Sequence, residues 1–322
     1  MIYFGEPSGA RTIRAMMYAP ADLDVGYTDP TAPRDVQLAE MADAEVLITN
    51  GLLWTADEFS RLPKLKMLQL MSAGFNTLDV PAIREMGIEV CNNSPAISNS
   101  VAEHAISLML MTFKRLEQGI AGVKDGKWQE HAKGGPHGTL FELAGRTVGI
   151  VGLGNIGSKV AKRLTGFETT TLYHDVREFD AAYLGGLHAQ KVSFDELLER
   201  SDAVTVHVPL NSQTKGMFST SEFKAMRDDA IFINTCRGPV HDEPALTKAL
   251  QNGDIAAAGL DVFEQEPTPL DNPLLHMDNV VVTPHLAGSS QERVDRALIF
   301  SFENARRVLK GEKPLNAVEI QD

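Results

Sequence analysis

A glycine-rich stretch at residues 148–157, Val-Gly-Ile-Val-Gly-Leu-Gly-Asn-Ile-Gly, constrains the fold more than any other part of the chain. A β-branched run leads into Gly152, Gly154 and Gly157, and residues 158–164 are typical of a helix. In this spacing the first glycine permits a tight turn, the second lets a pyrophosphate approach the backbone, and the third lets the helix pack on the strand. Phosphates would then lie at the helix N-terminus, so the stretch predicts a dinucleotide site.

Asp175 supports this interpretation of the glycine motif. It follows a second apolar run, which contains Leu172 and Tyr173, at close to the spacing of about 20 residues where a carboxylate meets the adenosine ribose. Its negative charge would repel a 2'-phosphate and so favours NAD over NADP, although Arg177 could offset that charge. The alternative is an ordinary strand–turn–helix unit that binds no ligand.

The composition limits the partners. A formal net charge of −13 argues against nucleic acid and anionic membranes, which leaves small molecules and other protein chains. With only two well-separated cysteines, Cys91 and Cys236, a disulfide framework is not expected. The first residues lack a signal-peptide pattern, and the longest apolar block, residues 105–113, is shorter than the ~20 residues of a membrane span. We therefore expect a cytoplasmic protein of about two domains.

Short apolar runs alternate with helical stretches in the first part of the chain. The expected elements are a strand at 15–19, a helix at 36–41, a strand at 46–49, a helix at 57–62, a strand at 67–71, a helix at 80–86 and a strand at 88–91. This alternation predicts a parallel, doubly wound sheet that is separate from the glycine-rich unit.

The next helix is expected to begin at Ser100, because Ser100 and Glu103 stand at capping-box spacing before an apolar run that extends to residue 116. Its faces are almost all apolar, and such a helix is buried on every side. It is therefore a core helix, a part of a homodimer interface, or both. His104 within it is either catalytic or a hydrogen-bonded structural histidine, and the structural interpretation is preferred.

A polar, glycine-rich surface loop is expected at residues 125–139. Its histidines, His131 and His137, are interpreted as solvated, because no cysteine or acidic cluster completes a metal shell. The sequence therefore predicts no metal site.

Strands and helices continue to alternate after Asp175. Helices are expected at 194–199, 221–226 and 243–252, and strands at 203–208, 230–234 and 256–262. Residues 145–285 thus carry about six strands, the number in a Rossmann sheet. Ligand groups should lie at the carboxyl ends of those strands.

A last helix is expected to begin at residues 289–290 and to end at Gly311, beyond this Rossmann unit. We expect it to pack on the N-terminal domain, which makes that domain discontinuous. The predicted fold is α/β with two doubly wound domains: a Rossmann cofactor domain at residues 99–287 is inserted into a flavodoxin-like substrate domain at residues 1–98 and 288–322.

From about residue 65 to residue 317 the chain resembles the NAD-dependent D-isomer-specific 2-hydroxyacid dehydrogenases. Seven stretches carry the resemblance in the family's order: Ser72-Ala-Gly-Phe-Asn76, Val101-Ala-Glu-His104, Gly152-Leu-Gly-Asn-Ile-Gly157, Val208-Pro-Leu210, Ile233-Asn-Thr-Cys-Arg-Gly238, Gly259-Leu-Asp-Val-Phe263 with Glu266-Pro267, and Thr283-Pro-His285. The first 60 residues match only in pattern. The resemblance implies hydride transfer between NAD(H) and C2 of a small D-2-hydroxy acid or 2-oxo acid.

The resemblance also implies roles for single residues. Arg237 matches the arginine that holds the substrate's carboxylate and polarises its carbonyl, His285 the acid–base residue, and Glu266 the carboxylate paired with it. The backbone amides of Ala73 and Gly74 match the loop that cradles the substrate's carboxylate. The implied cofactor contacts, with Asp261 near the nicotinamide carboxamide, are Gly152, Gly154, Asn155, Ile156, Gly157, Asp175, Val208, Pro209, Thr214, Thr235, Cys236, Asp261, His285 and Gly288.

Elementary chemistry asks for the same residue types. Hydride transfer to a 2-oxo acid leaves an alkoxide, so a group such as histidine must surrender a proton as charge develops on oxygen. A planar guanidinium can meet a carboxylate through two parallel hydrogen bonds. Singly, each residue could be an ordinary loop side chain, but together at strand ends they favour catalysis. Cys236 is interpreted as supplying backbone contacts rather than a reactive thiol.

Other functions stay open. Relatives with formate or phosphite as hydride donor share the fold, but formate oxidation releases no hydroxyl proton and the formate enzymes have glutamine at the position of Glu266. A second alternative is an NAD(H)-sensing scaffold that resembles the C-terminal-binding-protein corepressors and acts through protein partners. The substrate is also open: the stretch at 72–76 is similar to D-lactate dehydrogenases, whereas Asn93-Ser94-Pro95 departs from them, and glyoxylate, hydroxypyruvate and 3-phosphohydroxypyruvate remain candidates.

Overall fold

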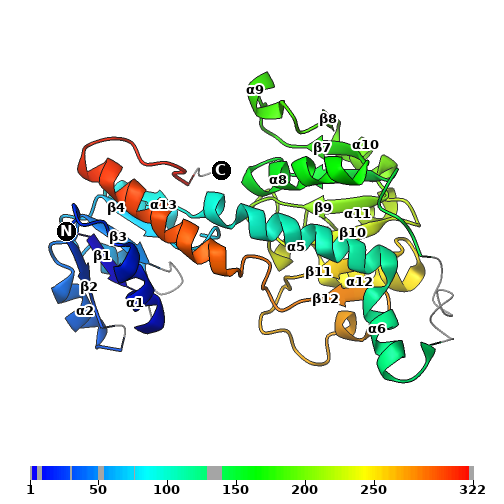
Figure 1. Cartoon of the computed structure of the whole chain (residues 1–322), viewed down its shortest axis with the longest axis horizontal. Coiled ribbons are helices and arrows are strands. Elements are labelled where there is room, and N and C mark those ends of the chain that lie inside the picture. The colour runs from blue at the N-terminus through cyan, green and yellow to red at the C-terminus, as the bar shows by residue number, and fades with distance from the viewer. Residues whose placement is uncertain are drawn as a thin grey trace. The chain divides into compact units, whose positions relative to one another are not determined.

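Alternating strands and helices form two parallel sheets in the computed structural model, which describes residues 2–5, 9–29, 31–49, 54–75, 77–128 and 140–318. The chain divides into two units (Figure 1): unit 1 comprises residues 1–97 and 289–322, and unit 2 comprises residues 98–288. The mixed α/β class with parallel sheets, predicted from the sequence, is confirmed. None of the described helices is long and apolar enough to cross a membrane.

Unit 1 contains a five-stranded parallel sheet in the order β2-β1-β3-β4-β5, the strand order of flavodoxin-like folds. Its strands are β1 (Ile2–Gly5), β2 (Val25–Tyr27), β3 (Val46–Thr49), β4 (Met67–Leu70) and β5 (Glu89–Cys91). Its helices are α1 (Gly9–Tyr18), α2 (Arg34–Glu40), α3 (Ala56–Phe59), α4 (Val80–Glu85) and α13 (Gln291–Leu309).

Two hydrophobic cores flank this sheet, because successive side chains of a strand point to opposite faces. Val46 and Ile48 of β3 pack with α1 and α13, whereas Leu47 packs with α2, α3 and α4. Helix α13 therefore belongs to the N-terminal sheet although it follows unit 2 in the chain. Ser290 caps this helix by accepting the N–H of Arg293 at 3.1 Å.

The predicted first strand at residues 15–19 is wrong. Residues 15–18 belong to helix α1, and the strands on either side of it, β1 and β2, were not predicted. Burial explains the error: Ala15 is fully buried, whereas Met16 and Met17 are 56% and 80% exposed. A short apolar run does not by itself distinguish a strand from a helix with one buried face.

Unit 2 contains a seven-stranded parallel sheet in the order β12-β11-β10-β9-β6-β7-β8, which is the Rossmann order extended by one strand. Its strands are β6 (Thr147–Val151), β7 (Thr170–His174), β8 (Ala189–Lys191), β9 (Ala203–Val206), β10 (Ile231–Asn234), β11 (Ala257–Leu260) and β12 (Val280–Val282). Strand β8 was not predicted, because it is an edge strand with a largely exposed, polar sequence.

Helices cover both faces of this sheet as well. Ile231 and Ile233 of β10 enter one core, and Phe232 enters the other. The helices are α5 (Ser94–Lys114), α6 (Leu116–Lys124), α8 (Asn155–Leu164), α9 (Ala181–Leu184), α10 (Phe194–Arg200), α11 (Thr220–Ala225) and α12 (Glu243–Asn252), with 3₁₀ turns η2 (Thr165–Phe167), η3 (Gly238–Val240) and η4 (Pro273–His276).

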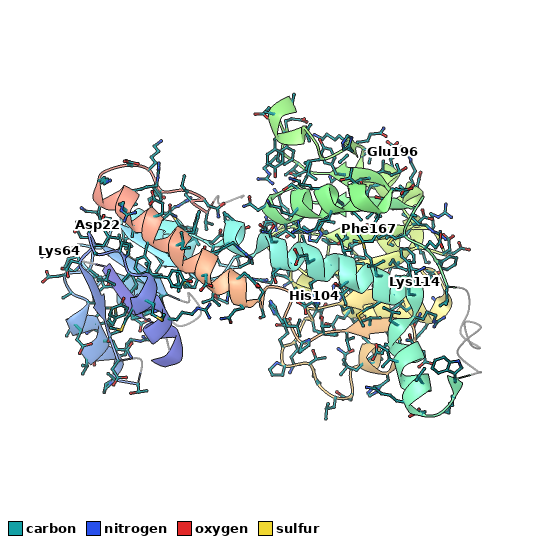
Figure 2. The ribbon with its side chains drawn as sticks, in the orientation of Figure 1. Asp22, Lys64, His104, Lys114, Phe167 and Glu196 are labelled. Atoms are coloured by element: carbon teal, nitrogen blue, oxygen red, sulfur yellow. The ribbon has the colours of Figure 1, made fainter. Side chains whose placement is uncertain are left out.

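Helix α5 begins six residues before the predicted Ser100, at Ser94, and the boundary between the units falls within it. The side chain of Asn92 accepts the N–H of Ser94 at 3.2 Å, and Pro95 suits a first helical turn. The exposed residues of α5 are Glu103 and Ser107, and most of its apolar side chains are buried, whereas Leu110 and Met111 are partly buried. This burial supports the core-helix interpretation; His104 and Lys114 mark the helix in Figure 2.

Candidate active site

The predicted cofactor residues all lie after the carboxyl ends of strands in unit 2, or in the first turn of the following helix. They follow β6 (Gly152, Gly154, Asn155, Ile156, Gly157), β7 (Asp175), β9 (Val208, Pro209, Thr214), β10 (Thr235, Cys236), β11 (Asp261) and β12 (His285, Gly288). In a parallel sheet these ends share one edge, and ligands bind where the strand order reverses. Here that point lies between β6 and β9.

The glycine turn after β6 is too crowded for larger residues. Gly152 has φ of 91°, and a Cβ there would lie 2.7 Å from the carbonyl oxygen of His207. A Cβ on Gly157 would lie 2.0 Å from the carbonyl oxygen of Gly152. The turn therefore needs glycine at both positions, and it leads directly into the N-terminus of α8, as a pyrophosphate site requires.

Asp175 connects this turn to the end of β7. Its Oδ2 accepts the N–H of Leu153 at 2.7 Å, and its Oδ1 accepts the N–H of Arg177 at 2.8 Å. The guanidinium of Arg177 contacts both carboxylate oxygens, at 3.3 and 3.4 Å. Asp175 thus holds the glycine turn as well as carrying a negative charge, and Arg177 partly balances that charge.

Two buried polar atoms at neighbouring strand ends fit a bound ligand. His207 Nδ1, after β9, and Thr235 Oγ1, after β10, have no hydrogen-bond partner among the described residues, and buried polar atoms are usually paired. Burial lowers the pKa of His207 to about 3, so its imidazole is neutral at pH 7. Thr214 closes the turn after Pro209 by donating its hydroxyl to the Pro209 carbonyl at 2.6 Å.

The turn that carries Arg237 is organised by Asn234, the last residue of β10. Asn234 Oδ1 accepts the N–H of Cys236 at 2.9 Å, and its Nδ2 donates to the carbonyl of Arg237 at 2.9 Å. Arg237 in turn donates to the carbonyl of Cys236 at 2.6 Å. Burial raises the pKa of the Cys236 thiol to about 11, which fits its interpretation as an unreactive residue.

Gly238 brings this turn against the loop that carries Glu266. A Cβ on Gly238 would lie 1.9 Å from the carbonyl carbon and oxygen of Phe263. Glu266 is tied to the same point, because its Oε1 accepts the N–H of Phe263 at 3.0 Å. The missing side chain of Gly238 therefore allows Arg237 and Glu266 to come from loops in direct contact.

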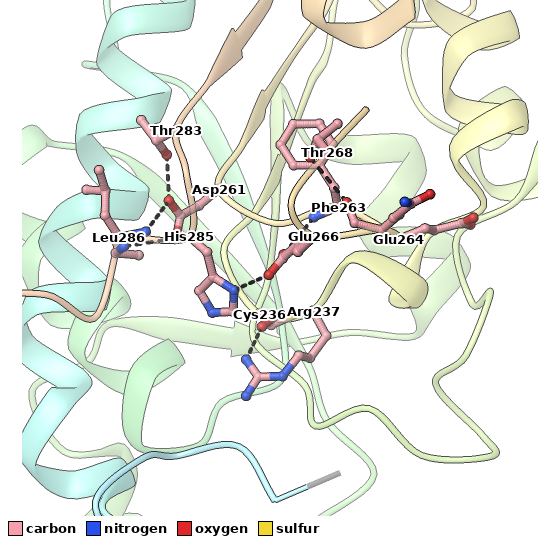
Figure 3. A network of polar contacts seen from close by, with 12 residues as sticks. Cys236, Arg237, Asp261, Phe263, Glu264, Glu266, Thr268, Thr283, His285 and Leu286 are labelled. Carbon is pink, nitrogen blue, oxygen red and sulfur yellow. Dashed lines mark hydrogen bonds and ion pairs between the residues drawn. The ribbon is translucent and has the colours of Figure 1, made fainter. Parts of the chain in front are cut away.

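His285 pairs with Glu266 across these loops. Its Nδ1 lies 2.6 Å from Glu266 Oε2 (Figure 3), and its Nε2 has no hydrogen-bond partner in the described part of the chain. The backbone of His285 is left-handed, with φ of 50°, a conformation that L-residues adopt at a cost. The imidazole is 45% exposed, and Nδ1 is the nitrogen that the carboxylate holds.

Asp261 holds the loop that carries His285. Its carboxylate is fully buried and accepts the hydroxyl of Thr283 at 2.6 Å and the N–H groups of Leu286 and Ala287, each at 2.9 Å. His104 joins from α5, with Nε2 lying 2.9 Å from Thr283 Oγ1. Burial lowers the pKa of His104, against the opposing effect of Asp261. These contacts fit the structural interpretation of His104.

Ala73 and Gly74 lie in unit 1, in the loop that follows β4. The side chain of Asn92 donates to the carbonyl of Ala73 at 2.7 Å, and Ser72 Oγ donates to the carbonyl of Gly74 at 2.9 Å.

His131 and His137 fall outside the described residues. No group of three His, Cys, Asp or Glu side chains within the described ranges could hold a metal ion.

The residues that hold the loops of this site in place were harder to find from the sequence than the residues that face it. Asn234, Gly238 and Thr283 were seen only as parts of matching stretches, yet each fixes a loop. One signal was available: an asparagine at a strand end commonly bonds the backbone N–H two residues later. The contact between Gly238 and Phe263 joins residues 25 positions apart and leaves no local pattern.

A family model described as "D-isomer specific 2-hydroxyacid dehydrogenase, NAD binding domain" matches residues 106–287. A glyoxylate reductase of Korarchaeum cryptofilum is 37% identical over 302 residues, which cover 92% of this chain and 89% of that protein. A D-3-phosphoglycerate dehydrogenase of Archaeoglobus fulgidus is 38% identical over 290 residues, which cover 89% of this chain and 54% of that protein.

A solved structure shares the whole architecture. The D-mandelate dehydrogenase of Rhodotorula graminis superposes with a TM-score of 0.85 at 27% identity, over 100% of this chain and 98% of that one. The similarity therefore extends through both units and is not confined to the dinucleotide-binding segment.

Proposed function

Because this chain belongs to the D-isomer specific 2-hydroxyacid dehydrogenase family, we propose that it interconverts a small 2-oxo acid and the corresponding D-2-hydroxy acid at C2. It is an NAD-dependent oxidoreductase of that family. Unit 2 would bind the cofactor, and unit 1 would be the substrate domain. The observation that carries the reaction is the pair of His285 and Glu266, whose Nδ1 and Oε2 lie 2.6 Å apart.

In the reductive direction, His285 would give a proton from Nε2 to the substrate oxygen. NADH supplies the hydride that goes to C2. Glu266 would keep the imidazole oriented, because its carboxylate accepts from Nδ1 and is itself held by the Phe263 N–H. A proton delivered as charge develops on oxygen stabilises the transition state more than the bound ground state.

Arg237 would bind the carboxylate of the substrate and polarise its carbonyl group. Its guanidinium offers a planar pair of donors, and the turn around it is held by the buried amide of Asn234. The amides of Ala73 and Gly74 would contribute donors for the same carboxylate. Figure 3 shows Arg237, Glu266 and His285 gathered in one part of unit 2.

NAD is expected to be preferred over NADP because Asp175 presents a negative charge beside the glycine turn. The remaining cofactor residues would contact the cofactor through the turn after β6 and the loops after β9 and β10. Asp261 would help to hold the nicotinamide end. Since Asp261 already accepts three hydrogen bonds from the His285 loop, we expect it to position that loop as well.

The test is NADH oxidation with a panel of 2-oxo acids: glyoxylate, hydroxypyruvate, 3-phosphohydroxypyruvate, pyruvate and phenylglyoxylate. Glyoxylate comes first because similar proteins are named glyoxylate reductases. Turnover with at least one acid, with the D-hydroxy acid as product, supports the proposal. Tight NADH binding with negligible turnover of every acid would contradict it and favour the nucleotide-sensing scaffold.

A homodimer and a cytoplasmic location remain proposals as well. The proposed dimer contact would include α6 beside the end of α5, because Leu116, Ile120 and Val123 are 43%, 53% and 49% exposed at helical spacing. Light scattering at micromolar concentration measures the mass directly. A monomer mass would contradict the dimer.

A further inference from the structure

Four consecutive carbonyl groups are anchored in the loop after β4. The carbonyl of Met71 accepts from Arg293 at 2.8 Å, and that of Ser72 accepts from the Asn93 N–H at 2.8 Å. The carbonyl of Ala73 accepts from Asn92 Nδ2 at 2.7 Å, and that of Gly74 accepts from Ser72 Oγ at 2.9 Å. All of these donors belong to unit 1.

The anchored carbonyls determine where the neighbouring amides point. A trans peptide is planar, so its C=O and N–H groups point in opposite directions. The bond from Asn92 to the Ala73 carbonyl therefore sets the direction of the Gly74 N–H, and the bond from Asn93 to the Ser72 carbonyl sets that of the Ala73 N–H. None of the four N–H groups from Ser72 to Phe75 donates to an acceptor within the described residues.

In the described part of unit 1, Asn92 is the only residue whose side chain donates a hydrogen bond to the Ala73 carbonyl. Asn92 is buried, with only 8% of its surface exposed. The side-chain amide of Asn92 both donates and accepts hydrogen bonds. Nδ2 donates to Ala73, while Oδ1 accepts the N–H of Ser94 at the start of α5 and the Nδ2 of Asn316. Only a side chain with a donor and an acceptor a short distance apart can do both.

We propose that Asn92 is a positioning residue for the substrate's carboxylate: by holding the Ala73–Gly74 peptide, it aims the Gly74 N–H at that carboxylate. This inference rests on the proposed function, in which Ala73 and Gly74 contact the substrate. Asn92 itself touches no reacting atom. It affects catalysis by orienting the peptide between Ala73 and Gly74.

The competing explanation is that Asn92 only caps helix α5. The two roles use different atoms, so they can be separated. Asn92→Ser keeps a short acceptor for the Ser94 N–H, because serine is a good cap, but its hydroxyl is too short to replace Nδ2 at Ala73. Asn92→Asp keeps the acceptor on a side chain of the same length and removes the donor.

The experiment compares wild type, Asn92→Ser and Asn92→Asp in NADH oxidation, with glyoxylate and with glyoxylamide, which lacks the carboxylate. Asn252→Asp, an exposed position at the end of α12, is the matched control. We expect KM for glyoxylate to rise on the order of 10-fold or more in Asn92→Ser, as for a lost hydrogen bond to a charged group. The affinity for NADH, measured by fluorescence, and kcat/KM for glyoxylamide should stay within about 3-fold of wild type.

An unchanged KM for glyoxylate in Asn92→Ser would overturn the inference. So would an equal loss with glyoxylate and glyoxylamide, because that pattern is the one expected from a cap alone. Should Asn92→Ser fail to fold, Asn92→Asp gives the same comparison, and its larger rise in KM would reflect the added negative charge as well. Absence of turnover by wild type with every 2-oxo acid is a different result, since it overturns the proposed function and this inference with it.

Discussion

The two units differ in the polar side chains that they bury, although both bury amides and hydroxyls. All nine histidines of the sequence lie between residues 104 and 285, inside unit 2. Unit 2 also buries the carboxylates of Asp175 and Asp261. The buried polar side chains described in unit 1 are amides and hydroxyls, among them Gln69, Asn93, Ser301 and Asn304.

This difference predicts different roles for the two units. Amides and hydroxyls keep the same donors and acceptors at any moderate pH, so they can fix a loop in one geometry. Asn93 shows this in unit 1, where it donates to Ser301 Oγ at 2.9 Å and to the Leu70 carbonyl at 3.2 Å. Imidazoles and carboxylates can change protonation state, as an acid–base reaction requires. Proton chemistry should therefore be confined to unit 2, and unit 1 should supply fixed contacts.

The largest effect should come from removing the proton donor in unit 2. His285→Ala is expected to lower kcat for 2-oxo acid reduction on the order of 10²- to 10⁴-fold, the usual range for a lost general acid. NADH binding, followed by fluorescence, should persist. A loss below about 10-fold, with chemistry rate-limiting, would show that the proton comes from another group.

Acid should weaken unit 2 through two buried histidines. Burial lowers the pKa of His207 to about 3 and that of His241 to about 4, from an ordinary value of 6.5. Below pH 6.5 the unfolded chain gains protons that the folded unit 2 does not take up. The contribution of the two histidines to the free energy of unfolding is therefore complete above pH 6.5. It falls by on the order of a few kcal/mol as the pH approaches 4.

Hydrogen exchange measured unit by unit at pH 7 and at pH 4.5 checks this prediction, after correction for intrinsic exchange rates. Unit 2 should lose more protection than unit 1, which contains no histidine. Replacing the buried His241 with Gln should reduce the difference. Equal losses of protection in the two units would contradict the proposed role of the buried histidines.

Substitutions in either unit should also affect substrate binding. Arg237→Lys keeps the charge but loses the two-pronged contact, so KM for the 2-oxo acid should rise about 10-fold or more with a smaller change in kcat. If Arg237 and the peptide held by Asn92 bind the same carboxylate, Arg237→Lys and Asn92→Ser should not be additive. Additive losses in the double-mutant cycle would mean that the two residues act on separate groups.

The smallest expected effect concerns the choice of cofactor. Wild type should have a higher kcat/KM with NADH than with NADPH, and Asp175→Asn should narrow the ratio by roughly 10-fold, because one repulsive charge is removed. Arg177, which contacts Asp175, limits the size of this change. Similar kcat/KM values for the two cofactors in wild type would contradict the assigned preference.

Local rules predicted most of the strands that carry the site. Strands β3, β4, β9 and β10 read as short apolar runs because they are buried on both faces, as in a parallel sheet. The same rule failed where an element has only one buried face or none. Helix α1 was taken for a strand on the strength of its apolar residues, and the exposed edge strand β8 was missed.

The sequence alone determined the glycine turn, because its demands are local: Gly152 needs a positive φ and Gly157 must approach a carbonyl five residues earlier. It also determined the residue types at the strand ends, since chemistry restricts which side chains can donate a proton or bind a carboxylate. Which loops hold those residues in place depends on contacts between parts of the chain that are far apart in sequence. Asn92 meets Ala73, and Gly238 meets Phe263, because parallel strands bring their carboxyl ends to one edge whatever the distance along the chain.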